Sequence, residues 1–189
     1  MATKTLKLSS LNPAEYPDIE VECEVIGDMK AYAEALIEYQ KSQGVKVESA
    51  KKTARVSARL GKIGEEVDTR PRVRRDGKVY VIGETKGKVK VEGSMIVQNP
   101  DGEEYIVKPD KFDAKYKATE TPGVYEPKDQ PIKYIPITKD ITFLAPWGEE
   151  MFGVKGAVLN VSNLDDVYAI QNEAFEKTYT PVKQEKTKW

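Results

Sequence analysis

Basic side chains gather in one short stretch of the sequence, Arg70–Arg75. Alternate residues of a β-strand share a face, so Arg70, Arg72 and Arg74 would present three guanidinium groups that could contact phosphates. A basic edge strand has a simpler purpose, because its charges oppose pairing with another sheet, and we favour this interpretation. Tyr80 lies nearby, but no aromatic residue interleaves with the run to stack on bases. Nucleic-acid binding is therefore disfavoured, with Arg70–Arg75 as its candidate site.

Histidine is absent, and Cys23 is the single cysteine among 189 residues. This excludes Ser-His-Asp and Cys-His catalysis, Cys/His zinc sites and disulfides within the chain. Several acidic residues occur as adjacent pairs, and neighbours on a strand point to opposite faces, so each pair offers one carboxylate to a site: Glu65-Glu66, Glu103-Glu104, Glu149-Glu150 and Asp165-Asp166. We expect no catalytic residue, no metal and no cofactor. An enzyme that uses carboxylates and lysines is the third hypothesis.

The overall charge is balanced, with 30 basic and 31 acidic residues. No apolar run approaches the roughly 20 residues that a membrane-spanning helix needs, and the N-terminus has no apolar segment. We expect a protein without membrane contact, located in the cytoplasm. Two tryptophans, Trp147 and Trp189, are candidate anchors for a protein partner. For Trp147, packing in the core is the favoured interpretation.

The N-terminal part predicts a strand followed by a helix, after an arm or an irregular edge segment over residues 1–18. Residues 19–26 alternate between apolar and acidic side chains, the period of a strand with one wet face, and Cys23 falls on the apolar face. Residues 29–44 carry apolar side chains at helical spacing. Asp28 can cap the start of this helix, and Gly44 suits its end. Residues 51–60 alternate again and predict a further strand.

An internal duplication organises the rest of the chain. Residues 88–116 align with residues 151–179 without a gap, at an offset of 63 residues. The register matches a turn glycine and three aromatic positions, pairing Gly93 with Gly156, Tyr105 with Tyr168, Phe112 with Phe175, and Tyr116 with Tyr179. In each copy the last two aromatics stand four residues apart, so on a short helix they share a face. We expect each pair to close the open end of a small sheet.

The duplication suggests domain boundaries. Residues 1–50 form the N-terminal strand-helix segment, 51–119 the first module and 137–182 the second. Residues 120–136 contain Pro122, Pro127, Pro131 and Pro136 and predict an extended linker. Residues 183–189 form a charged tail.

The repeated stretch resembles a known family. Glu92–Val97 and Asp101–Tyr116 are similar to the PGDYG family, small domains frequent in phages and prophages that end in Tyr-x3-Pro-Asp-x-Phe-x3-Tyr. The ending is matched here, whereas Glu92, Ser94 and Met95 replace the Pro, Asp and Tyr of the turn that names the family. Phe175–Tyr179 and Gly153–Gly156 carry the likeness into the second copy. The resemblance implies a phage protein, in the host cytoplasm or in the virion, and it supplies no catalytic residue.

Together these observations predict an α+β protein, with an N-terminal strand-helix unit and two related β-rich modules, each closed by a short helix. The leading functional hypothesis is a non-enzymatic, phage-type accessory or virion-associated protein that binds a protein partner or itself. The alternative is a small-ligand or nucleotide-binding module. Its cleft would lie between the repeats and be lined by Arg72, Arg74, Tyr80 and Tyr105.

Overall fold

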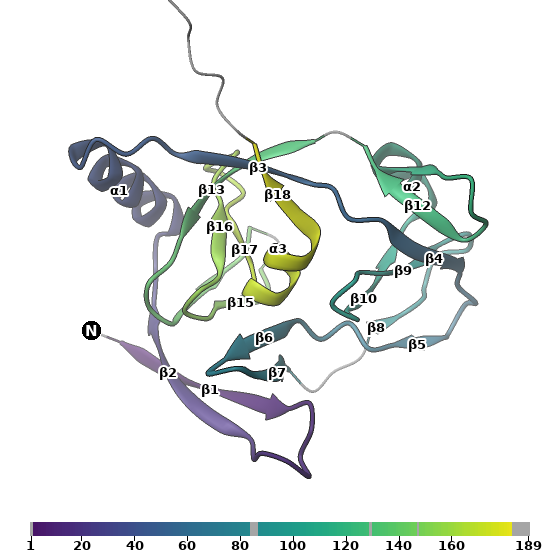
Figure 1. The fold of residues 1–189 in the computed structure, drawn as a ribbon. Coiled ribbons are helices and arrows are strands. Elements are labelled where there is room, and N and C mark those ends of the chain that lie inside the picture. Colours follow the sequence, from purple (N-terminus) through teal and green to yellow (C-terminus); the bar gives the residue numbers. More distant parts are fainter. Residues whose placement is uncertain (1, 84–86, 129, 147, 183–189) are drawn as a thin grey trace, which may run out of the picture.

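The computed structural model describes residues 2–83, 87–128, 130–146 and 148–182 (Figure 1). Strands hold 43% of the chain and helices 16%, distributed over several sheets, one of them curled into a half-barrel. The prediction of an α+β fold with helix-closed modules is therefore wrong, and the protein is β-rich. The physical reason is that the modules are joined by shared sheets, while the two short helices contribute only seven residues each. Among the described residues, no helix has the length and apolarity needed to cross a membrane.

A six-stranded sheet joins the N-terminus to both halves of the chain. Its order is β15 (Glu150–Gly153), β14 (Ile141–Leu144), β2 (Ile19–Val25), β1 (Thr3–Ser10), β7 (Lys78–Ile82) and β6 (Arg72–Arg75), and only the β14–β2 pair is parallel. Leu8, Cys23 and Val73 are fully buried against it. The predicted burial of Cys23 is confirmed. Part of the expected N-terminal arm is the regular strand β1, because Leu6 and Leu8 alternate into this core.

Two five-stranded sheets share one strand order. The first sheet runs β10 (Glu104–Val107), β9 (Met95–Gln98), β4 (Val56–Leu60), β12 (Val124–Pro127), β11 (Tyr116–Ala118). The second sheet runs β17 (Tyr168–Ile170), β16 (Val158–Asn160), β13 (Pro131–Pro136), β3 (Glu48–Lys52), β18 (Tyr179–Pro181). A separate ribbon pairs β5 (Glu66–Val67) with β8 (Gly87–Lys88). Each position in the first sheet therefore has a counterpart in the second.

Two arms of the chain cross between these sheets (Figure 1). The first arm passes from β3 in the second sheet to β4 in the first, and the second arm passes from β12 in the first sheet to β13 in the second. Their registers correspond, since Tyr116 pairs with Pro127 and Tyr179 pairs with Lys52. The predicted linker of residues 120–136 is thus the second crossing arm, with its prolines in and beside strands. Proline is tolerated there because its missing N–H can face away from the neighbouring strand.

The short helices α2 (Pro109–Lys115) and α3 (Asn172–Thr178) occupy equivalent places in the two halves. Each is followed by a C-cap tyrosine, Tyr116 or Tyr179. The turns before β9 and β16 hold Gly93 and Gly156 at φ of 84° and 99°. Such positive φ angles favour glycine, which lacks a Cβ. The elements therefore recur at the 63-residue offset.

Each helix carries one aromatic pair into a small core. The ring centroids of Phe112 and Tyr116 lie 5.3 Å apart, and those of Phe175 and Tyr179 lie 5.4 Å apart. The second crossing arm completes both clusters, with Tyr125 against Phe112 and Tyr134 against Phe175. This arm consequently ties the two cores together.

The helix predicted near the N-terminus is confirmed as α1 (Met29–Ser42), with the Asp28 side chain accepting a hydrogen bond from the Ala31 N–H at 3.0 Å. Ala33 of this helix is fully buried against Ile135 and Leu159 of the second five-stranded sheet. The same core includes Ile141 and Phe143 of the six-stranded sheet, so helix α1 packs between two sheets and does not form a separate unit with β2.

Candidate functional site: a tyrosine-lined pocket between the repeats

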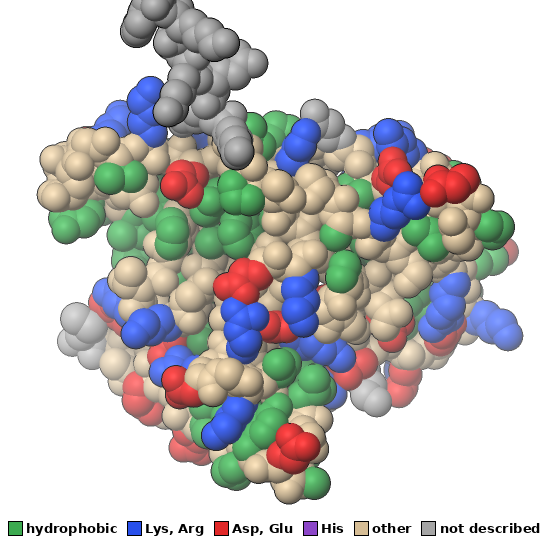
Figure 2. Space-filling view, in the orientation of Figure 1, with side chains coloured by type: hydrophobic (Ala, Val, Ile, Leu, Met, Phe, Trp, Pro, Cys, Tyr) green, Lys and Arg blue, Asp and Glu red, His purple; other side chains and the backbone are tan. Residues whose placement is uncertain are grey.

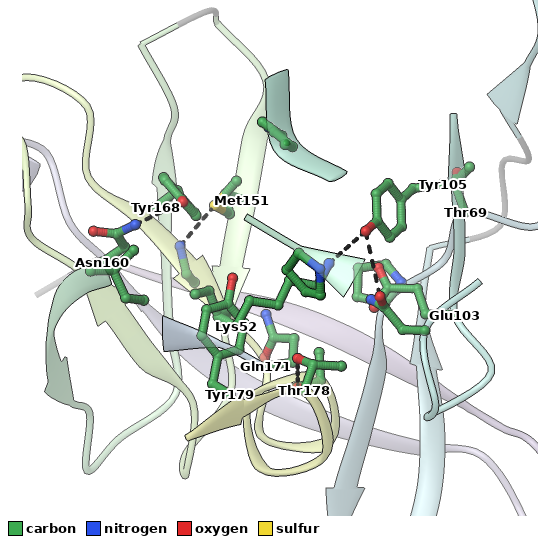
Figure 3. Close-up of a pocket in the computed structure, with 18 of the residues that line it drawn as sticks. Lys52, Thr69, Glu103, Tyr105, Met151, Asn160, Tyr168, Gln171, Thr178 and Tyr179 are labelled. Carbon is green, nitrogen blue, oxygen red and sulfur yellow. Dashed lines mark hydrogen bonds between the residues drawn. The ribbon is translucent and has the colours of Figure 1, made fainter. Parts of the chain in front are cut away.

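A pocket of about 860 Å³ lies between the two five-stranded sheets, against the rim of the six-stranded sheet (Figure 3). Matched positions of the two repeats line it together, namely Tyr105 with Tyr168, Tyr116 with Tyr179, Asn99 with Ser162, and Lys115 with Thr178. The crossing arms add a fifth matched pair, Lys52 of β3 and Pro127 of β12. The pocket is thus lined by equivalent positions of both repeats. Two matched pairs are tyrosines in both repeats, whereas the other three differ in chemistry.

Lys52 is the central charged group of the pocket. Its backbone pairs with Tyr179 in the second sheet, whereas its side chain reaches the first repeat. The Nζ atom donates hydrogen bonds of 2.6 Å to the hydroxyls of both Tyr105 and Tyr116. These two hydroxyls also contact each other, and the Tyr105 hydroxyl donates to Asn99 Oδ1 at 3.4 Å. An ammonium has three N–H groups, and no described residue accepts from the third.

Burial shifts the proton affinities of this cluster. Desolvation lowers the pKa of Lys52 to about 8, Glu103 and Asp101 act in the opposite direction, and repulsion from Lys115 lowers the value further. Burial also raises the pKa of Glu103 to about 7, with Asp101 adding to the rise and Arg72 and Lys52 opposing it. Near neutral pH, Lys52 therefore gives up its proton readily and Glu103 is near its titration midpoint. Both side chains lie at the first repeat, in what we call the first half of the pocket.

The pocket residues contributed by the second repeat, residues 151–179, are uncharged. The Tyr168 hydroxyl accepts a 2.7 Å hydrogen bond from Asn160 Nδ2. Gln171 Nε2 donates to the Phe152 carbonyl at 2.6 Å, and the Met151 sulfur accepts from the Ala169 N–H at 3.2 Å. Burial is the largest cause of the raised pKa values of Tyr168 and Tyr179, so both phenols stay protonated. These residues can supply hydroxyl, amide and thioether contacts to a ligand.

Three other charged side chains of the lining have partners in the protein. Arg70 binds both carboxylate oxygens of Asp68 at 2.8 Å, and this contact is the largest cause lowering the Asp68 pKa to about 2. Lys128 donates to the Asp113 carbonyl at 2.6 Å, and Glu150 pairs with Lys4 at 2.6 Å. Lys52 differs from these three, because it is half-buried and no described residue accepts its third N–H.

The predicted arginine face is divided among separate contacts. Of the residues proposed for a ligand cleft, Tyr105 lines the pocket, as does Arg70 from the basic run. Arg74 binds Glu173 and Glu176 of α3, and Arg72 lies against Gly102 with its Nη1 buried and unpaired. On the visible face, basic and acidic side chains are interleaved (Figure 2). The Arg70–Arg75 stretch therefore makes contacts within the protein.

Of the remaining predicted residues, some pack in the cores of the fold and others lie outside the described part of the chain. Tyr80 is buried, with its ring edge-on to Tyr16 at 5.4 Å between centroids. Trp147 and Trp189 lie outside the described residues. Tyr116 and Tyr179, predicted as structural, both pack in their clusters and line the pocket.

The sequence analysis missed the pocket residues Lys52, Glu103, Asn160 and Tyr168 as functional candidates. The repeat register carried a signal for Tyr168, because it aligned with the candidate Tyr105. Lys52 had no such signal, since its counterpart Pro127 lies on the other crossing arm and becomes equivalent only through strand pairing.

No family model, curated protein or solved structure matches the chain.

Proposed function

We propose that the protein binds a small molecule in the pocket between its repeats. The observation that carries this proposal is the Lys52 ammonium in a pocket of about 860 Å³, bound to two tyrosine hydroxyls and with no described residue accepting its third N–H. Ligand pockets commonly enclose roughly 300–1,000 Å³ and combine apolar walls with a few fixed polar groups. A charge that is only partly desolvated and has no carboxylate in contact is a natural site for a ligand group.

The ligand chemistry follows from the lining. Lys52 and Lys115 favour a carboxylate or phosphate at the first half of the pocket, since an anion there would compensate two neighbouring cations. Asn160 and Tyr168 offer hydrogen bonds to hydroxyl or amide groups farther along. Met151 can contact an apolar or planar portion. We therefore infer a small anionic metabolite with a polar distal part, a class that includes nucleotides.

A thermal-shift screen tests this proposal. The panel contains small carboxylates, phosphate monoesters and nucleotides, each titrated against the wild type and against Lys52→Met. A true ligand raises the Tm saturably, because binding to the folded state adds free energy with ligand concentration. Lys52→Met should reduce the shift strongly. Absence of any saturable shift across the panel, or equal shifts in both proteins, would contradict the proposal.

A second candidate function is an interaction protein of a phage, in the host cytoplasm or virion, as the PGDYG resemblance implies. One observation favours it: Leu60 and Ile63 are 65% and 61% exposed beside the turn at Gly61. Exposed apolar side chains close together suit a protein contact. Affinity purification from infected cells should recover one stoichiometric partner with the wild type. Leu60→Ser/Ile63→Ser should lose it, while Lys52→Met retains it.

A further inference from the structure

We propose that Lys52 forms a reversible imine with a carbonyl group of the pocket's ligand. This inference rests on the proposed function and narrows the ligand class to aldehydes or ketones that also carry an anionic group. The step concerns covalent capture of the ligand and requires no turnover.

The hydrogen bonds of Lys52 direct its lone pair. An ammonium has three N–H groups, and two of them are donated to Tyr105 and Tyr116 at 2.6 Å. Loss of the third proton leaves a neutral amine that can keep both donated bonds. Its lone pair then occupies the vacated direction, where no described residue accepts. The two tyrosines thereby hold the nitrogen in an orientation suited to attack on a bound carbonyl carbon.

Lys52 also differs from other lysines in the groups that accept its hydrogen bonds. Lys30 lies 3.1 Å from Asp165, and Lys177 lies 2.9 Å from Glu173. A carboxylate at this distance favours the charged form of lysine. Lys52 contacts two phenols, while the carboxyl groups of Glu103 and Asp101 act on it without a direct hydrogen bond. Burial and the repulsion from Lys115 bring its pKa to about 8, so a neutral amine is accessible near pH 7.5.

The chemical step balances without an added oxidant or reductant. The nitrogen lone pair forms a C–N bond to the carbonyl carbon, and the π electrons move to the carbonyl oxygen, which takes up a proton. The amine nitrogen loses two protons, which balance the two that the oxygen takes up, and the C–O bond breaks so that water leaves as the C=N bond forms. Tyr105 and Tyr116 are protonated hydroxyls in contact with each other and with Nζ, so they can pass the proton to the departing oxygen. Hydrolysis reverses each step.

Reductive methylation measures this reactivity with the smallest carbonyl compound. The full chain is treated with limiting ¹³C-formaldehyde and cyanoborohydride, which reduces an imine to a methylamine, and each site is quantified by mass spectrometry and NMR. At pH 7.5 an amine with a pKa near 8 is about one-quarter neutral, whereas an ordinary lysine is only about one-thousandth neutral. We expect Lys52 to react at least about tenfold faster than Lys30, the exposed lysine paired with Asp165.

The pH dependence of the methylation rates distinguishes a lowered pKa of Lys52 from mere exposure of its side chain. The ratio of the Lys52 rate to the Lys30 rate should be high at pH 7.5 and fall steadily above pH 8, because Lys30 continues to deprotonate after Lys52 is fully neutral. Both sites share the reagents, so changes in reduction rate cancel in the ratio. A Lys52 rate no greater than that of Lys30 at pH 7.5, or a ratio independent of pH, would overturn the inference.

The outcome is distinguishable from failure of the proposed function. If anions stabilise the protein through Lys52 but Lys52 shows no enhanced methylation, the pocket binds ligands without an imine. If Lys52 is selectively methylated but the thermal-shift panel is flat, the amine is activated and the proposed anionic ligand class is wrong. When both hold, a ligand from the panel should also protect Lys52 from methylation.

Discussion

The Nζ atom of Lys52 lies 2.6 Å from the hydroxyl of Tyr116, although the two residues belong to different five-stranded sheets. In its own sheet Lys52 pairs with Tyr179, which is the counterpart of Tyr116 in the second repeat. One lysine therefore contacts one tyrosine through its side chain and pairs with the matching tyrosine through its backbone. This arrangement depends on the crossing of β3 from one sheet to β4 of the other.

Replacing Lys52 with methionine should stabilise the protein at neutral pH. The folded pKa of Lys52, about 8, lies below its value of 10.5 in water, so burial disfavours the charged form. The resulting penalty is fully present below pH 8 and disappears as pH rises to 10.5. We expect Lys52→Met to raise the free energy of unfolding by at most about 3 kcal/mol at pH 7.

Urea denaturation of both proteins between pH 7 and 10.5 checks this prediction. The difference between them should shrink across that range, with Glu103, Asp101, Lys115, Tyr105 and Tyr116 present in both as the neighbouring titratable groups. A constant difference would mean that Lys52 titrates as an ordinary lysine. Lys30→Met serves as the control, because Lys30 is exposed and should show little stabilisation.

Glu103→Gln should stabilise the protein above pH 7 and have little effect below pH 4.5. Burial, followed by Asp101, raises the folded pKa of Glu103 to about 7, whereas Arg72 and Lys52 oppose the rise. The unfolded carboxyl ionises near pH 4.5, so its ionisation progressively destabilises the folded state between pH 4.5 and 7. We expect a gain for Glu103→Gln of at most about 3 kcal/mol at pH 8.

Thermal unfolding at pH 4.5, 6 and 8 measures the effect. Glu104→Gln is the matched control, because Glu104 is the adjacent residue and does not line the pocket. Equal behaviour of the two variants at pH 8 would show that Glu103 ionises like an exposed side chain.

Part of the fold could be predicted because its signals are local. The amphipathic spacing and Asp28 cap identified helix α1, and the repeat register aligned α2 with α3 through Tyr116 and Tyr179. The expected extended linker of residues 120–136 contains strands β12 and β13. Its prolines disfavour regular strands on average, but Pro127, Pro131 and Pro136 occupy strand positions that the pairing tolerates.

Apart from Arg70, only pocket residues that lie in the repeated stretches could be predicted from the sequence. Tyr105 was identified as a ligand candidate, and its alignment with Tyr168 pointed to the matching position. Lys52 required knowledge of which sheet each strand joins, since its counterpart is Pro127 rather than another lysine. The sheet that a strand joins depends on contacts between residues far apart in the sequence. The alternation of apolar and polar residues along a strand does not encode that choice.

The two aromatic clusters should differ in their contribution to stability. Phe112 is buried at 6% exposure, whereas Phe175 packs partly exposed against its cluster, although the repeat makes the two residues look equivalent. We expect Phe112→Ala to cost about 3–5 kcal/mol and Phe175→Ala about 2–3 kcal/mol. Chemical denaturation of both variants measures the difference. Losses below about 1 kcal/mol at both sites would show that neither ring belongs to a core.

The contact between α3 and β6 should depend on one carboxylate. The Glu173 side chain is only 3% exposed and lies 2.5 Å from Arg74 Nη1 and 2.9 Å from Lys177 Nζ, whereas Glu176 binds Arg74 from the surface at 52% exposure. Removing the charge of Glu173 leaves two cations without their buried partner. Glu173→Gln should therefore destabilise the protein by about 2–3 kcal/mol, and Glu176→Gln by less than about 1 kcal/mol.

Denaturation at low and high salt distinguishes these two contributions. Salt screens exposed charges more effectively than buried ones, so the small effect of Glu176→Gln should fade at 1 M NaCl while the effect of Glu173→Gln persists. Because α3 ends at Tyr179, loosening this helix should also disturb the pocket. Glu173→Gln is thus expected to weaken ligand-induced stabilisation, and Glu176→Gln to leave it intact. Equal salt sensitivity in the two variants would place the Glu173 contact at the surface and contradict its role in holding α3 against β6.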